Sequence, residues 1–177
     1  MPARLRHLAL FAFCGASAGC GAQPSDATDA DTNDDSSDPA SPCSPGGGEP
    51  KLEIGHGETA YLPLEPGGSL ELIHGPQGGV HVLVALQAAY IDASDEVVAS
   101  FRGYIDGEQL GASFPFLNMR CNEAEGGVQS WNTFLIWDAQ PEDLHLQTVH
   151  IEVELTDASG LVLNASKEAV LHDPLLE

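Results

Sequence analysis

Residues 74–90 constrain the fold of this chain more than any other stretch. Residues 75–79 combine a proline of fixed φ with glycines that tolerate positive φ, which is the chemistry of a tight turn. After this turn, apolar side chains recur at every second position: Val80, Val82, Val84, Leu86, Ala88 and Tyr90. A period of two is typical of a β-strand with one face in a core. The intervening residues are weakly apolar, so we expect a long central strand that is covered on both faces.

The rest of the C-terminal region shows further short strands separated by turn signals. The Asp-Gly pair at 106–107 is one of the strongest short hairpin signals. The turns at 92–95 and 157–160 share the tripeptide Asp-Ala-Ser, and both are expected to be hairpins. Residues 149–155 alternate strictly between apolar and polar. With no helical stripe in any segment, this pattern predicts an all-β fold, an antiparallel sandwich of about eight strands.

The N-terminal residues 1–19 have the pattern of a secretory signal. Two arginines precede an apolar core at residues 8–14, and small residues lead from there to Cys20. The apolar core is too short to span a bilayer permanently. The ending Ser17-Ala18-Gly19-Cys20 resembles a bacterial lipobox, which implies cleavage before Cys20 and acylation of that cysteine. Gly21 is not an inner-membrane retention signal, which favours the outer membrane. The alternative is an ordinary cleaved signal followed by an incidental cysteine.

Residues 20–49 have the composition of a disordered acidic linker. Six aspartates lie among Ser, Thr, Ala and Pro, without a basic or large apolar residue. Such a segment buries too little surface to offset its ordering entropy. We expect it to hold the folded domain, residues 50–177, away from the lipid surface. That domain is long enough for a core of its own.

Charge restricts the partners of this domain. Residues 50–177 contain 20 acidic and four basic residues, so the net charge is near −16. A field of this sign opposes binding to nucleic acid and to anionic lipid headgroups. We therefore expect no nucleic acid among the partners and a domain that is soluble in an extracytoplasmic space.

A family resemblance extends these expectations. The segment GETAYLPLEPGGSLELIHGPQGGVHVLVAL, residues 57–86, resembles lipoproteins of unknown activity that are typical of myxobacteria. The lipobox-like ending and the acidic tether belong to the same resemblance, and GPQGG-x-H-V at residues 75–82 is its most specific part. It implies an immunoglobulin-like (Ig-like) sandwich on the cell envelope, and it implies no activity.

The histidines of the domain are candidate metal ligands. None of them lies in an H-x-H or H-E-x-x-H spacing, and Cys121 lacks the following His and Met of a blue-copper site. His74 and His81 bracket the turn and are the pair placed to approach each other. We predict no cofactor and keep copper or zinc binding at His74 and His81 as the alternative. The six are His56, His74, His81, His145, His150 and His172.

Catalytic patterns are not recognisable in this sequence. The serines lack a nucleophile elbow, and the paired carboxylates lie in predicted loops. Trp131 and Trp137, six residues apart on a predicted strand, are expected to share one face. They are either core residues or a platform for a sugar ring, and the apolar strand between them favours the core. We predict that the protein is not an enzyme.

A disulfide is expected between Cys43 and Cys121. Cys14 leaves with the signal and Cys20 is consumed by lipid, so these two cysteines remain in an oxidising compartment. Two unpaired thiols or an intermolecular bond through Cys43 are the alternatives. The sequence thus predicts a lipid-anchored β-sandwich of the envelope that serves as a binding or structural module. Its expected partners are the membrane, through Cys20, and an envelope protein or glycan.

Overall fold

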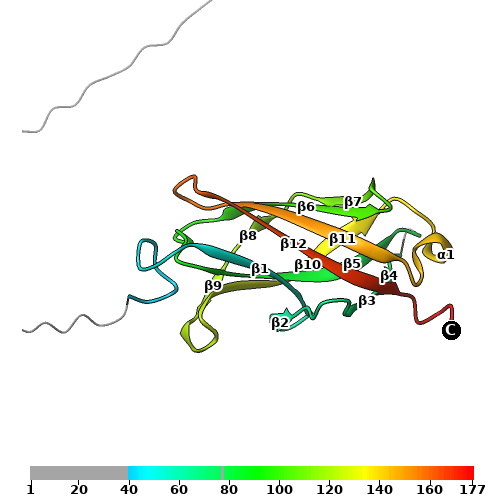
Figure 1. The fold of residues 1–177 in the computed structure, drawn as a ribbon, viewed down its shortest axis with the longest axis horizontal. Helices are drawn as coiled ribbons and strands as arrows, with labels where there is room; N and C mark the ends of the chain where they lie inside the picture. Colours follow the sequence, from blue (N-terminus) through cyan, green and yellow to red (C-terminus); the bar gives the residue numbers. More distant parts are fainter. Residues whose placement is uncertain (1–39, 77) are drawn as a thin grey trace, which may run out of the picture. The chain divides into compact units, whose positions relative to one another are not determined.

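The structure is a computed structural model that describes residues 40–76 and 78–177 (Figure 1). The predicted signal peptide, the lipidation site Cys20 and most of the predicted linker lie outside the described residues. These three features therefore remain predictions.

The described chain is all-β, which confirms the expected fold class. No helix in residues 40–76 and 78–177 has both the length and the apolar character to cross a membrane. Twelve strands exceed the expected eight, because five of them are pieces of two or three residues that are too short to show a period. The helical elements are one 3-10 turn, η1 (Glu123–Glu125), and one short helix, α1 (Pro141–Leu144). The strands are β1 (Lys51–His56), β2 (Leu62–Pro63), β3 (Ser69–Glu71), β4 (Ile73–His74), β5 (Val80–Ala89), β6 (Val97–Ile105), β7 (Glu108–Ser113), β8 (Phe116–Leu117), β9 (Arg120–Asn122), β10 (Gly127–Trp137), β11 (Thr148–Thr156) and β12 (Val162–His172).

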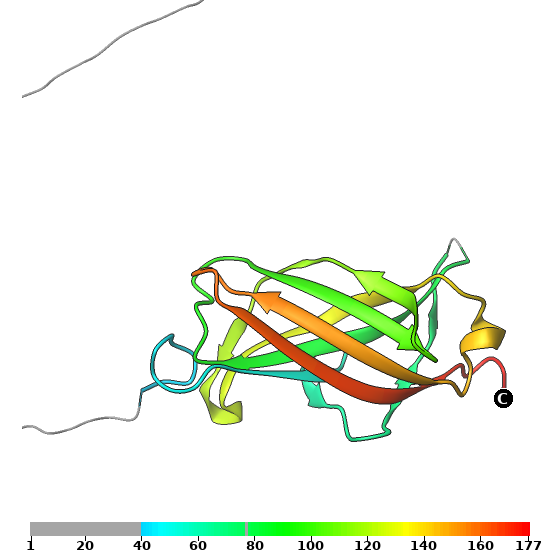
Figure 2. The ribbon, with the colours of Figure 1, turned by 45° about the horizontal axis from the view of Figure 1, so that its top comes forward.

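All twelve strands belong to one sheet that bends into two layers (Figures 1 and 2). Its order is β2-β1-β5-β10-β7-β6-β11-β12-β3, with β4 beside β5, β8 beside β6 and β9 beside β10. β7 joins the layers because it pairs with both β10 and β6. Residues 69–74 also connect them, since β3 pairs with β12 and β4 with β5. The β3–β12 pair is parallel, so the sheet is mixed and departs here from the expected antiparallel arrangement.

The core lies between the two layers. The predicted inward positions Val82 and Val84 of β5 and Val149 and Ile151 of β11 are fully buried, which confirms both alternations. They pack in one cluster with Phe101 of β6. The long period-two runs are therefore the strands that cover each other across the core.

The three turns predicted after the long strand differ in outcome. Asp106-Gly107 closes the β6–β7 hairpin, with both residues at positive φ. Residues 157–160 close the β11–β12 hairpin. Residues 92–95 do not form the expected hairpin, because Tyr90, at φ 59°, ends β5 and the chain crosses to β6 in the other layer. The local turn chemistry of Asp-Ala-Ser is the same in both connections and does not specify the partner of the next strand.

The two Asp-Ala-Ser loops lie against each other. The buried carboxylate of Asp157 accepts a hydrogen bond from the backbone N–H of Asp92 at 2.9 Å, and Asp92 O accepts one from Ala158 N–H. Asp157 also accepts bonds from Ser159 and from Leu161 N–H. Burial raises the pKa of Asp157, but these hydrogen bonds outweigh burial and hold its pKa below the ordinary value.

The packed domain starts ahead of the expected boundary at residue 50. Pro42 O accepts a hydrogen bond from Tyr90 N–H at 2.8 Å. Gly47 and Gly48 pack against the ring of Tyr90, and a Cβ atom added at Gly48 would lie 2.5 Å from it. The Gly-Pro-Ser composition of this segment predicted a flexible chain. In the structure, Gly47 and Gly48 have no side chains, and this leaves room for the ring of Tyr90.

Candidate functional site

β10 has an open edge in its middle. One edge pairs with β5 over residues 128–130 and 133–137. The other edge pairs with β9 at residues 127–129 and with β7 at residues 136–137. Among the described strands, none pairs with this second edge over residues 130–135.

Proline explains why the chain leaves β10 at this point. The strand β7 ends at Ser113, and Phe114-Pro115-Phe116 follows. Pro115 has no N–H to donate to a ladder with β10. Its carbonyl instead accepts a hydrogen bond from Ala99 N–H, and β8 pairs with β6. The yellow-green segment from β7 to β9 can be followed in Figure 2.

A groove of about 530 Å³ lies between the open edge and this diverted segment. It is lined by residues 113–118, residues 130–134 and Ile136, and we call it the β10 groove. None of these lining residues carries a charge, although the domain has a net charge near −16. The groove therefore offers an uncharged surface on an acidic domain.

The two faces of the sheet give the β10 groove two kinds of side chain. Its outer side, the apolar rim, consists of Phe114, Phe116, Trp131, Phe134 and Ile136; all are exposed except Trp131, which is half-buried. Its inner side, the hydroxyl floor, consists of Ser113, Ser130 and Thr133. Ser130 and Thr133 are buried, and the Ser113 hydroxyl is buried without a hydrogen-bond partner among the described residues. The rim thus offers apolar contact, whereas the floor is a largely buried surface of hydroxyl-bearing side chains.

A β-bulge separates the two tryptophans and corrects the expectation that they share a face. The register of β10 against β5 shifts between Ser130 and Thr133, and Asn132 lies at φ 57°. Trp137 is consequently a core residue, 3% exposed, as the apolar strand favoured. Trp131 points outward instead, with the Arg120 guanidinium 5.2 Å from its ring centre.

His81 belongs to the surface beside the apolar rim. Its ring lies 4.5 Å from that of Phe134, centre to centre, and burial lowers the pKa of His81. On the paired strands, Ile73 lies opposite His81 and His74 lies opposite the buried Val80. Because successive side chains of a strand point to opposite faces, the structure does not bring His74 and His81 together.

His74 instead joins a group near the C-terminus. Its Nε2 lies 2.8 Å from Oδ2 of Asp173, a side chain with no solvent exposure. Asp173 Oδ1 accepts a bond from Leu175 N–H, and Asp173 N–H donates to His145 Nδ1. Burial raises the pKa of Asp173, but the bond from Leu175 N–H, the bond from His74 and the electrostatic effect of the neighbouring His74 and His145 together lower it below the ordinary value. The group ties the C-terminal segment to β4 and to the α1 end of the domain.

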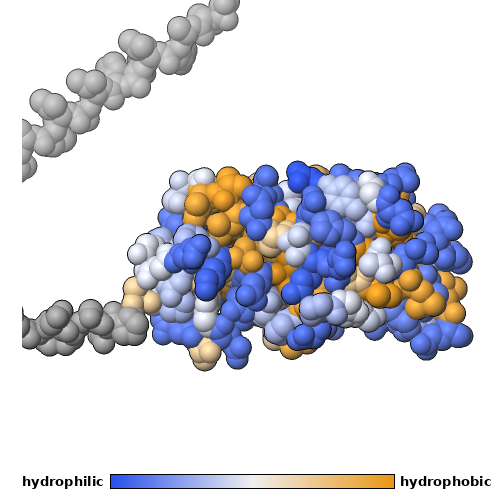
Figure 3. Space-filling model, in the orientation of Figure 1, coloured by the Kyte–Doolittle hydropathy of each residue, from blue (hydrophilic) through white to orange (hydrophobic). Residues whose placement is uncertain are grey.

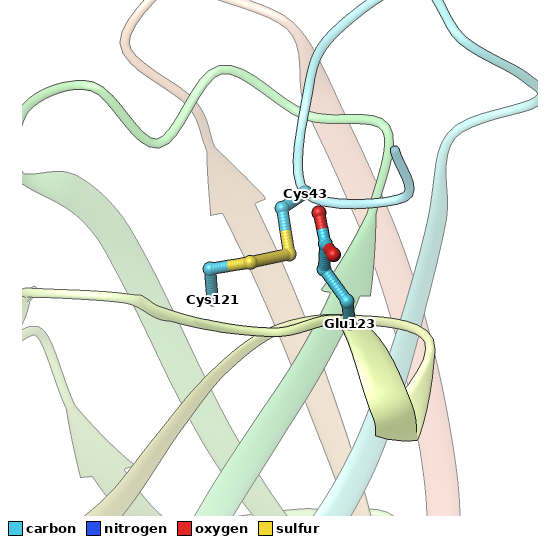
Figure 4. A group of neighbouring side chains, drawn as sticks. All are labelled: Cys43, Cys121 and Glu123. Carbon is cyan, nitrogen blue, oxygen red and sulfur yellow. A yellow bond between two sulfur atoms is a disulfide. The ribbon is translucent and has the colours of Figure 1, made fainter. Parts of the chain in front are cut away.

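The predicted disulfide is present. Cys43 and Cys121 are bonded, with their Cα atoms 5.6 Å apart (Figure 4). Within the described residues, these sulfurs and Glu123 form the group of potential metal ligands whose donor atoms lie close together. A disulfide sulfur is not a thiolate, and Glu123 accepts a 2.6 Å hydrogen bond from the Ser41 hydroxyl. The geometry here fastens the segment before β1 rather than offering a metal site.

The face formed by β11 and β12 is more polar than the β10 groove. Figure 3 shows it largely covered by hydrophilic residues with separate apolar patches between them. A depression of about 340 Å³ on this face contains Arg102, Glu152 and Glu154. On the same strand, β11, Nε2 of His150 lies 3.5 Å from Oε1 of Glu152, and the side chain of His150 is half-exposed, which fits a solvated strand position.

No protein-family model matches this chain, and no curated protein matches it.

The β10 groove was missed by the sequence analysis, although two of its parts left a signal. Pro115 lies between two phenylalanines, and the strand of Trp131 is apolar on both faces. The missing information was which edge of that strand stays unpaired.

Proposed function

We propose that this protein is a binding module of the cell envelope that uses the β10 groove as its binding surface. The observation that carries this proposal is the collection of exposed apolar side chains around an uncharged groove on a strongly acidic domain. The module would be held at the membrane by lipid on Cys20, the expectation drawn from the lipobox-like ending.

The apolar rim has the composition of an interface rather than of an ordinary surface. Single exposed apolar residues are common on soluble proteins, but contiguous apolar patches mark interaction sites. The centres of protein interfaces are depleted in charge and enriched in aromatic residues, as the rim is. Phe114 and Phe116 flank a proline that restrains their backbone, so less conformational entropy is lost when a partner orders them.

Site-specific photo-cross-linking in growing cells tests the proposal. A photoreactive amino acid replaces Phe116, which is 67% exposed, or Leu146, which is 65% exposed and does not line the groove. We expect discrete cross-linked products from position 116 and none from position 146. A second substitution on the rim, Phe134→Ser, should reduce the products from position 116.

Equal products from both positions, or none from position 116, would refute the β10 groove as the binding surface. The disulfide is checked in each variant by non-reducing electrophoresis, so that a misfolded chain is recognised.

A further inference from the structure

We infer that the occupant of the β10 groove is a short extended segment of polypeptide that joins the open edge of β10 as an added strand. This inference rests on the proposed function, because it names the ligand of the same groove. It is carried by three observations: an unpaired backbone edge, closure of that edge at both ends, and side chains of opposite character on its two faces.

The unpaired edge supplies main-chain hydrogen bonds for an incoming strand. Over residues 130–135, the described chain provides no strand on the groove side of β10. The N–H of Asn132 is used by Gly57 O, which follows β1 on the far side of β5, and not by a group in the groove. Apart from the bulge at Asn132, the groove-side backbone groups of this run have no strand partner among the described residues, and such an edge can pair with an added strand.

Closure at both ends limits what can enter. β9 occupies the edge up to residue 129, and β7 occupies it from residue 136. Six free residues at about 3.3 Å each give an opening of about 20 Å. The wall formed by residues 113–118 excludes the long flat edge of a second folded copy, whereas a single extended segment of about six residues fits.

The rim and the floor predict the sequence of that segment. A strand beside β10 would place every second side chain next to Trp131, Phe134 and Ile136, and the others next to the hydroxyl floor. Apolar residues suit the first set, and small polar residues such as serine or threonine suit the second, because the floor beside them consists of hydroxyl-bearing side chains. The segment should carry no charge inside the groove, while basic residues outside it would be attracted by the acidic domain.

A defined peptide tests this inference. The probe is an acetylated and amidated octapeptide, Lys-Val-Ser-Val-Thr-Val-Ser-Lys, titrated into secreted residues 21–177 with the disulfide formed. The first control has the same composition with its valines consecutive, which removes the alternation. The second control carries N-methyl groups on alternate backbone nitrogens, which removes main-chain donors and leaves the side chains unchanged.

We expect the alternating peptide to bind at least about tenfold more tightly than either control. Amide exchange of alternate residues between 130 and 135 should slow on binding, because their N–H groups gain partners. Trp131→Ala should weaken binding, whereas Leu146→Ala should not, because the exposed Leu146 does not line the groove.

Equal binding of the consecutive or N-methylated control would overturn strand addition. Failure of all three peptides, together with binding of a neutral hexasaccharide that protects no amide at 130–135, would also overturn it. In that case the cross-linking at position 116 would still support the groove as a binding surface. Loss of the cross-links as well would refute the proposed function itself.

Discussion

The indole of Trp137 is enclosed by two glycines on neighbouring strands. Gly103 of β6 and Gly111 of β7 lie opposite each other in register, and both contact its ring. A Cβ atom added at Gly103 would lie 2.4 Å from the ring, and the buried indole has no free space to move into. This contact sets the corner where β7 joins the two layers, and hence one end of the β10 groove.

We predict that Gly103→Ala lowers the free energy of unfolding by about 1–3 kcal/mol, because the methyl group overpacks this contact. The measurement is urea unfolding followed by tryptophan fluorescence. Gly79→Ala is the matched control, since nothing lies within 4 Å of the added Cβ atom. We expect it to change the free energy of unfolding by no more than about 0.5 kcal/mol. Similar unfolding midpoints for the two variants would contradict the packing described for Trp137.

Asp173 makes the stability of the domain depend on pH in the acidic range. Its pKa is lowered in the folded state, so the unfolded chain takes up a proton at a higher pH than the folded one. The stabilisation is therefore complete above the ordinary aspartate pKa of about 3.9 and is lost as the pH falls through the lower folded pKa. We expect Asp173→Asn to unfold at lower urea concentration than the wild type at pH 7, with a difference that shrinks towards about pH 3.

Asp138→Asn serves as the comparison for this pH dependence, because the Asp138 side chain is exposed. At pH 7, the urea concentration at which Asp138→Asn unfolds should differ little from that of the wild type. The unfolding midpoints of Asp173→Asn and the wild type are compared from pH 7 to about pH 3. If their difference stayed constant over this range, Asp173 would not be held ionised by its neighbours.

At the scale of elements, the disulfide fastens residues 40–49 to β9, and this segment also bonds to Tyr90 just after β5. Cys43 and Cys121 are 78 residues apart, and closing such a loop stabilises the folded state by on the order of 4 kcal/mol in the chain-entropy model. We predict that reduction lowers the unfolding midpoint and accelerates amide exchange of Tyr90, whose N–H bonds to Pro42 O.

The double variant Cys43→Ala/Cys121→Ala should show the lowered midpoint from the outset and no further response to reductant. If reduction left both the midpoint and the Tyr90 exchange rate of the native protein unchanged, the segment would be held by its packing on Tyr90 alone.

For the whole molecule, the prediction concerns where the domain is held. Acylation of Cys20 should carry the protein into the detergent phase, since each buried methylene contributes about 0.8 kcal/mol. We expect metabolic labelling with a fatty acid to mark the wild type and Cys43→Ala, but not Cys20→Ala. An unlabelled wild type would refute the lipid anchor and leave a freely secreted binding module.

The features that depend on neighbouring residues alone were predictable from the sequence. The hydrogen bond from Gly75 N–H to Gly79 O before β5, the hairpin at 106–107 and the inward positions of residues 149–155 follow from turn chemistry and from the period of a strand. The disulfide followed from the number of cysteines that remain after secretion. Each of these signals is contained in a few consecutive residues or in a count.

The candidate site depended on tertiary structure because edge pairing is a relation between distant segments. Residues 92–95 and 157–160 have similar turn chemistry, yet one connects the layers and the other closes a hairpin. The bulge at Asn132 turned Trp131 outward and left Trp137 in the core. The sequence by itself predicted that residues 129–137 form an apolar strand. Only the assembled sheet decided that the middle of its edge stays open, because β7 and β9 occupy both ends and Pro115 turns the chain away between them.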